Sequence, residues 1–116
     1  MESSNLLEVV MANTDAHVYV KDANFRFVYV NAALAHTLQT TQEALIGKID
    51  ADFVDEGSAL PFRKADIEVL ESEKSISLET TIQVKGHRLS FEDRKFPITL
   101  PDGSRGVAGI AFLTEE

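Results

Sequence analysis

The side chains that could carry acid–base or nucleophilic chemistry are few and scattered along this sequence. The three histidines fall in different settings, His17 in an expected strand, His36 in an early helix and His87 at a turn, and no Ser or Asp is arranged around them as in a hydrolase. The sequence also has no glycine-rich phosphate loop and no nucleophile elbow. The absence of cysteine excludes disulfides, thiolate metal sites and cysteine nucleophiles. We therefore predict no catalysis by these residues, and interpret each histidine as a surface or satisfied group.

One acidic run has a composition that could bind a divalent cation. Asp50, Asp52, Asp55 and Glu56 are interleaved with apolar residues such as Phe53. Their spacing lacks the glycine at the sixth loop position and the distal glutamate of a calcium loop. A short helical turn that places its apolar members in the core is the simpler interpretation, so we predict no metal site.

The totals of the sequence are those of one acidic domain. Its 116 residues suit a single domain over 1–116, and 44% hydrophobic with 26% charged residues is ordinary for a soluble globular fold. The formal net charge of -8 opposes the phosphate backbone, which argues against a nucleic-acid partner for this domain. No apolar run approaches the roughly 20 residues that span a bilayer, and the start lacks the basic region of a signal peptide. We expect a cytoplasmic chain without membrane insertion, in keeping with its lack of cysteine.

Two runs near the N-terminus have the period of a β-hairpin. Residues 17–21 and 25–30 both alternate in the manner of strands, with Phe25, Phe27 and Tyr29 expected on one face of the second. Between them lies Lys21-Asp22-Ala23-Asn24, in which Asp bonds its own backbone and Asn tolerates a left-handed turn conformation.

A helical segment follows the hairpin. Asn31 supplies an N-cap oxygen for a first helix, and Thr41 opens a short second helix that Gly47 closes. A longer helix is expected up to Lys74, with Ser58 as its cap and Pro61 in its first turn. The spacing predicts that one face of this helix consists of Phe62, Ile67 and Leu70, with Ala65, Asp66 and Val69 near its edges.

The period changes to two from Ser75 onward. Residues 76–84, 87–100 and 106–114 read as three strands, joined by turns at Gly86-His87 and at Pro101-Asp102-Gly103. Two strand-rich ends therefore flank one helical middle. We predict an α+β fold in which an antiparallel sheet of about five strands carries the helices on one face.

Taken together, these elements resemble the PAS sensor family. The family pattern is a strand ending in Asp, a strand ending in aromatic-Val-Asn, and a later Leu-Ile-Gly, which here read Asp22, Tyr29-Val30-Asn31 and Leu45-Ile46-Gly47. The long helix and the last two strands continue the likeness, the latter through Lys95-Phe96-Pro97-Ile98 and Gly106-Val107-Ala108-Gly109-Ile110. The resemblance covers nearly the whole chain and implies the PAS fold, with residues 16–116 as its core.

The cofactor classes of PAS domains can be tested against these residues. The LOV type needs a cysteine after Leu-Ile-Gly, and residues 48–53 have none, so a cysteinyl-flavin is excluded. Ile110 occupies the place of the flavin-bonding glutamine of that type. Haem-binding relatives commonly take a histidine from the long helix, which has none here, leaving only His36 or His87 as a distant option. We expect no such cofactor and, at most, a small organic ligand.

The resemblance places a ligand site between the sheet and the helices. Ligand sites are commonly apolar hollows with a few orienting polar groups. A filled hydrophobic core without a ligand is an equally good interpretation of the same residues. Two of them are tyrosines, whose buried hydroxyls need hydrogen-bond partners that a polar ligand can supply. The predicted lining is Tyr19, Tyr29, Phe53, Phe62, Ile67, Leu70, Phe91 and Ile110.

The first 13 residues predict an amphipathic helix. Its apolar stripe consists of Leu6, Leu7, Val10 and Met11. The stripe either covers the outer face of the sheet or packs on a second copy, and the PAS resemblance implies a homodimer contact here.

Together these observations predict a sensory PAS domain from a bacterial-type signalling protein. It would bind a small molecule and signal to a C-terminal effector in the same protein, such as a diguanylate cyclase, a histidine kinase or a transcriptional regulator. The family commonly ends in Asp-Ile-Thr before a signalling helix, where this sequence has Phe112-Leu113-Thr114, which suggests coupling by packing through Phe112. The alternative is a ligand-free PAS module that mediates dimerisation or protein–protein interaction.

Overall fold

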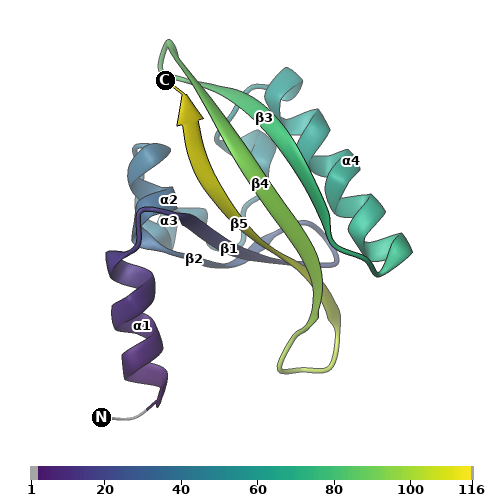
Figure 1. Ribbon diagram of the computed structural model, residues 1–116. Coiled ribbons are helices and arrows are strands. Elements are labelled where there is room, and N and C mark those ends of the chain that lie inside the picture. The colour runs from purple at the N-terminus through teal and green to yellow at the C-terminus, as the bar shows by residue number, and fades with distance from the viewer. Residues whose placement is uncertain (1–2, 116) are drawn as a thin grey trace.

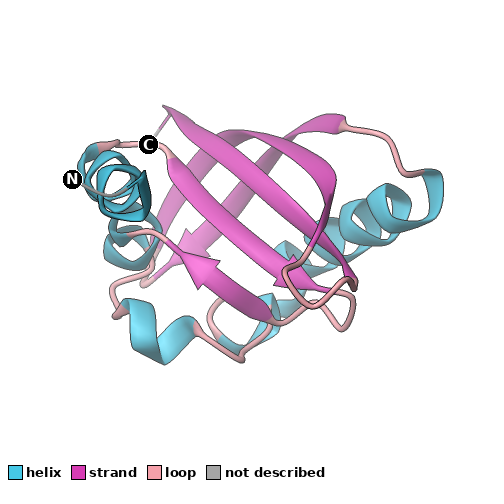
Figure 2. Ribbon diagram, turned by 90° about the horizontal axis from the view of Figure 1, so that it is seen from below, coloured by secondary structure: helices cyan, strands magenta, loops and turns pink. Residues whose placement is uncertain are grey.

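A computed structural model describes residues 3–115, with the side chains of 6–114. One antiparallel sheet contains all five strands in the order β2-β1-β5-β4-β3 (Figures 1 and 2). The predicted fold class is thereby confirmed; residues 1, 2 and 116 of the predicted domain lie outside the described residues. The strands are β1 His17–Asp22, β2 Phe27–Val30, β3 Ile76–Val84, β4 His87–Thr99 and β5 Arg105–Glu115. The helices are α1 Ser3–Asn13, α2 Ala32–Thr37, α3 Gln42–Leu45, the 3-10 turn η1 Asp50–Asp52 and α4 Glu56–Ser72.

The β1–β2 hairpin forms as predicted, but its turn and its faces differ from the prediction. Asp22 Oδ1 accepts the backbone N–H groups of Asn24 and Arg26, and the left-handed residue is Phe25, at φ 66, rather than Asn24. A register shift between Val20 and Lys21 then interrupts the alternation. The expectation that Phe27 and Tyr29 share a face is therefore wrong.

Asn31 ties the hairpin to the helices. Its Oδ1 accepts the N–H of Leu34, which confirms the predicted N-cap of α2, and also accepts the N–H of Val18 in β1. Its Nδ2 donates to the carbonyl groups of Ala16 and Met11. One buried amide thus fixes α2 against the sheet and anchors the end of α1.

The long helix α4 starts earlier than predicted and buries a different face. Its N-cap is Asp55, which accepts from both the N–H and the hydroxyl of Ser58, so Ser58 lies inside the helix instead of capping it. The expected face is wrong too, because Asp66 and Val69 are fully buried while Ile67 is exposed. Carboxylates are rarely buried unless they are paired, and the partners of Asp66 come from other elements that helical spacing does not reveal.

Helix α1 extends away from the sheet (Figure 1). Leu6, Leu7 and Val10 are exposed, whereas Met11 is half-buried. The other described residues therefore do not cover the apolar stripe, and the interpretation that it packs on the outer face of its own sheet is wrong. None of the helices within residues 3–115 is both long and apolar enough to cross a membrane.

Candidate functional site

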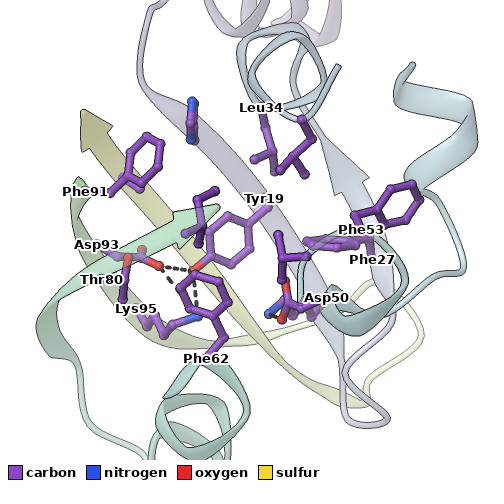
Figure 3. Close-up of a pocket in the computed structure, with 16 residues that line it drawn as sticks. Tyr19, Phe27, Leu34, Asp50, Phe53, Phe62, Thr80, Phe91, Asp93 and Lys95 are labelled. Carbon is purple, nitrogen blue, oxygen red and sulfur yellow. Dashed lines mark hydrogen bonds and ion pairs between the residues drawn. The ribbon is translucent and has the colours of Figure 1, made fainter. Parts of the chain in front are cut away.

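A cavity of about 60 Å³ lies between the inner face of the sheet and the helical side (Figure 3). The strands supply one wall, and α2, α4 and the segment around η1 supply the other. Most of the lining side chains are apolar, and the polar ones gather toward the middle and the α4 side. The lining residues are His17, Tyr19, Lys21, Phe27, Leu34, Leu38, Asp50, Phe53, Val54, Phe62, Thr80, Ile82, Phe91, Asp93, Lys95 and Ala111.

Half of the residues predicted from sequence line this cavity. The structure brings together Tyr19, Phe53, Phe62 and Phe91. They come from β1, the segment after η1, α4 and β4, which are distant in sequence. For these four aromatic side chains, the position between the sheet and the helices that the PAS resemblance implies agrees with the structure.

The other four predicted residues lie outside the cavity lining. Tyr29 opposes Val20, and Ile110 opposes Val18, so both point to the outer face, away from Tyr19 and its inward neighbours. Ile67 is exposed on α4, and Leu70 is half-buried beyond the cavity lining. The bulge in β1–β2 accounts for Tyr29, and the rotation of α4 accounts for Ile67 and Leu70. Ile110 faces outward because it is out of phase with Gly109, the β5 partner of Tyr19.

The polar side of the cavity is built around a buried carboxylate, Asp66. Its Oδ2 accepts from Lys21 Nζ at 2.7 Å, and its Oδ1 accepts from Lys95 Nζ at 2.8 Å. Lys21 Nζ also donates to Asp50 Oδ2 at 2.6 Å. Burial opposes the charge of Lys21, but the attraction of Asp50 and Asp66 outweighs it and raises the pKa of this lysine. The ammonium group of Lys21 is therefore retained in the interior.

Tyr19 connects this centre to a second buried acid. Its hydroxyl donates to Asp93 Oδ2 at 2.8 Å and accepts from Lys95 Nζ at 2.8 Å (Figure 3). Burial, followed by the nearby carboxylates, raises the pKa of Tyr19 well above its ordinary value, so the phenol keeps its proton. The ring lies over Gly109, its ladder partner in β5, where a Cβ atom would overlap the phenol. Glycine at this position is required by that close approach.

The charged residues of this cluster were missed by the sequence reasoning. We call Tyr19, Lys21, Asp66, Asp93 and Lys95 the buried network. A signal was present, because Lys21 alternates in phase with Tyr19 and therefore had to share its inward face. Asp66 likewise lies four residues after Phe62, on the same side of α4.

His17 closes the other side of the cavity. Its Nε2 shares a hydrogen bond of 2.8 Å with Thr37 Oγ1, and its ring centroid lies 4.7 Å from that of Phe91. Burial lowers the pKa of His17 to about 4. The imidazole is neutral at pH 7 and acts as a polar but uncharged part of the wall.

The acidic run after Gly47 has structural roles. Asp50 pairs with Lys21, Asp52 accepts the N–H of Ile49, and Asp55 caps α4. Within the part of the chain that the structure describes, no group of three His, Cys, Asp or Glu side chains is arranged to hold a metal ion.

Comparisons with known proteins give one family and one fold. The PAS fold family matches residues 11–115. An uncharacterized protein of Sinorhizobium fredii, y4lL, is 32% identical over 79 residues, which cover 68% of this chain and 10% of that protein. The VqmA dimer of Vibrio cholerae aligns with a TM-score of 0.85 at 20% identity, over 99% of this chain and 52% of that chain. Another similar structure is VqmA bound to DPO.

A further similar structure is a PAS domain of a protein from Colwellia psychrerythraea, with a TM-score of 0.79 at 16% identity. It aligns over 97% of this chain and 98% of that one. The chain thus spans a tenth of y4lL and about half of VqmA, but nearly all of a single solved domain.

Proposed function

This chain belongs to the PAS fold family, and from that premise we propose that it is a sensory domain that binds a small molecule in the cavity between its sheet and its helices. The binding event would be passed to an effector in the same protein, outside these residues. The domain itself would not be catalytic.

The observation that carries this proposal is the composition of the cavity wall. Phe53, Phe62 and Phe91 offer apolar contacts, while Asp93 and Lys95 place polar groups against the same space. Binding sites are typically apolar hollows with a few fixed polar groups. A core without a ligand gains nothing from five buried ionic or phenolic groups, because replacing a buried ion pair with apolar residues is often neutral or stabilising.

The comparison with VqmA adds support at the level of fold alone. A structure of that protein is described as bound to DPO. The identity of 20% does not carry a ligand across. The whole protein to which this domain belongs, and an effector such as a diguanylate cyclase, histidine kinase or transcriptional regulator, remain part of the proposal.

The route of output proposed here runs along β5. Ala111 lines the cavity, and the next residue, Phe112, is 59% exposed on the opposite face of the same strand. A ligand that displaces Ala111 would move Phe112 with it, because adjacent strand residues share one backbone. An effector packed on Phe112 would sense that displacement.

Native mass spectrometry of protein purified without added ligand tests the proposal. We expect a retained small molecule in the wild type and its loss in Ala111→Leu, which fills the cavity from β5. Ala108→Leu is the matched control, since Ala108 lies on the same strand but outside the cavity lining. If wild type and both variants behave alike, the cavity is not the binding site.

A second function is favoured by a different observation, the exposed stripe of α1. Leu6, Leu7 and Val10 are uncovered, and exposed apolar clusters commonly mark contact surfaces. We propose that these residues, with Met11, form a homodimer contact. It would be present with or without a ligand.

A further inference from the structure

One oxygen atom in the cavity wall has no hydrogen-bond partner. Among the described residues, Asp93 Oδ1 is the single buried side-chain nitrogen or oxygen atom without one, and Asp93 as a whole is only 4% exposed. An unpaired buried polar group of this kind is costly, so native structures nearly always supply a partner. Asp93 itself lines the cavity (Figure 3). A donor that reaches Oδ1 from this cavity would supply the partner.

The neighbouring polar groups are already engaged. Both oxygens of Asp66 accept from lysines, and Lys95 Nζ donates to Asp66 and to Tyr19. On Asp93 itself, Oδ2 accepts from the Tyr19 hydroxyl and lies 3.6 Å from Lys95 Nζ. Among the four carboxylate oxygens of Asp66 and Asp93, Asp93 Oδ1 alone has no hydrogen-bond partner in the described residues.

The charge of the cluster decides what kind of partner fits. The two ammonium groups of Lys21 and Lys95 face three carboxylates, those of Asp50, Asp66 and Asp93. Burial raises the pKa of the Asp93 carboxyl, an effect that the charge of Lys95 and the hydrogen bond from Tyr19 oppose. When Asp93 is ionised, the carboxylates outnumber the ammonium groups, and the excess negative charge repels an anionic ligand. An ionised carboxylate can only accept hydrogen bonds, so its partner must donate one.

The other lining residues and the cavity volume limit the size of the ligand and favour a largely apolar one. Phe62, Ile82, Phe91 and Ala111 surround the space near Asp93 with apolar surface. The cavity measures about 60 Å³, while an engineered cavity of about 150 Å³ holds benzene. A five-membered ring, only slightly smaller than benzene, therefore fits only when the lining side chains move outward.

We propose that the ligand of this cavity is a small, non-anionic molecule with an apolar body and an N–H or O–H donor, and that this donor bonds Asp93 Oδ1. The assignment rests on the proposed function, because it specifies the ligand class of the same cavity. It makes Asp93 the residue that selects the ligand, while the aromatic wall supplies most of the contact.

Pyrrole and furan form a matched pair of probes for this assignment. Both are five-membered rings of nearly equal shape, but pyrrole has an N–H donor where furan has an acceptor oxygen. We expect pyrrole to bind wild-type protein about 5-fold to 150-fold more tightly, the range that corresponds to one unpaired buried group. The measurement is a titration followed by the backbone amide NMR signals of residues that line the cavity.

Two variants locate the effect. Asp93→Asn keeps an oxygen for the Tyr19 hydroxyl but turns an NH2 group toward the cavity, so the preference for pyrrole should fall to about one or reverse. Glu92→Gln removes the same charge from the adjacent residue, which is exposed on the other face of β4, and should leave the preference intact. If Asp93→Asn does not fold, the comparison of the two probes in wild type decides alone.

The outcomes separate this inference from the proposed function. Equal affinities, or tighter furan, would mean that water satisfies Asp93 Oδ1, and would overturn the donor assignment while leaving a small-molecule site in place. Failure of both rings to shift the cavity signals would also overturn it. The proposed function is judged independently, by the molecule that co-purifies and its loss in Ala111→Leu.

Discussion

The inner face of the sheet carries buried charged residues and the outer face carries exposed apolar ones, which is the reverse of the usual distribution. On the inner face, Lys21 and Lys95 are each only 1% exposed. On the outer face, Ile110 and Phe112 of β5 are exposed, at 36% and 59%. Lysine is almost never fully buried unless it is paired, whereas a large exposed apolar surface is itself informative.

The two faces differ in whether the chain itself provides partners for their side chains. Inside, every charge has a partner of opposite sign within the same chain, so burial is tolerated. Outside, the apolar side chains of β5 and the stripe on α1 have no cover from the described residues. The domain itself supplies the ion pairs of the inner face, where only Asp93 Oδ1 lacks a hydrogen-bond partner among the described residues. The outer face is available for a partner.

Removing the Asp66 carboxylate at the centre of the buried network should cause the largest loss of stability and so abolish the contrast between the two faces. Asp66→Ala leaves two buried ammonium groups without their shared carboxylate, and we expect a loss of about 3 to 5 kcal/mol in the free energy of unfolding. Urea denaturation measures this loss. Glu68→Ala, at an exposed position of the same helix, should change stability by no more than about 0.5 kcal/mol. Similar values for the two variants would show that the network does not stabilise the interior.

Acid should weaken the inner face through His17. The unfolded chain binds a proton on His17 near pH 6.5 and the folded chain only near pH 4, so the stability held above pH 6.5 is lost as the pH falls through this window. We expect the stability advantage of wild type over His17→Gln to shrink by about 1 to 2 kcal/mol between about pH 7.5 and pH 5. Urea midpoints at both pH values test this. A constant difference would mean that the folded state accepts the proton.

Crowding the ring of Tyr19 disturbs the buried network of the inner face without removing a charge. Gly109→Ala places a methyl group where the phenol lies, and we expect a destabilisation of about 1 to 3 kcal/mol from displacement of the ring. The cost should be smaller in a Tyr19→Leu background, because the overlapping atoms belong to the end of the phenol. Additive effects in this double-mutant cycle would contradict the proposed overlap.

Substitutions on the uncovered apolar stripe should have the smallest effect on folding. Leu7→Glu combined with Val10→Glu is expected to change the stability of the monomer by only about 0.5 kcal/mol per site or less. The same variant should lower the sedimentation coefficient if the stripe forms the dimer contact. Ala12→Glu, also exposed on α1, is the control. A dimer that survives the double substitution would place the contact elsewhere, with Phe112 as the next candidate.

The sequence alone was sufficient for the architecture, because the signals that define it act over a few residues. The alternation in 76–84 identified a strand, and Asn31 identified the start of α2. Gly47, with φ 82, occupies the left-handed position expected after a short helix. The ordered motifs then led to the PAS fold. That resemblance, together with the spacing of apolar residues, predicted Tyr19, Phe53, Phe62 and Phe91 between the sheet and the helices, where they line the cavity.

Only the tertiary structure decided which charges are buried and which predicted residues face away. Asp66 meets Lys21 across 45 residues of sequence and Lys95 across 29, so neither pairing has a local signal. The rotation of α4 over the sheet brings them together, and a bulge between Val20 and Lys21 leaves Tyr29 on the opposite side. Local sequence patterns determine the period of each helix and strand. The rotation of a helix and the register of a strand depend instead on which side chains of distant elements are buried together. For this reason the side chain of Asp66, and not that of the expected Ile67, lies on the buried face of α4.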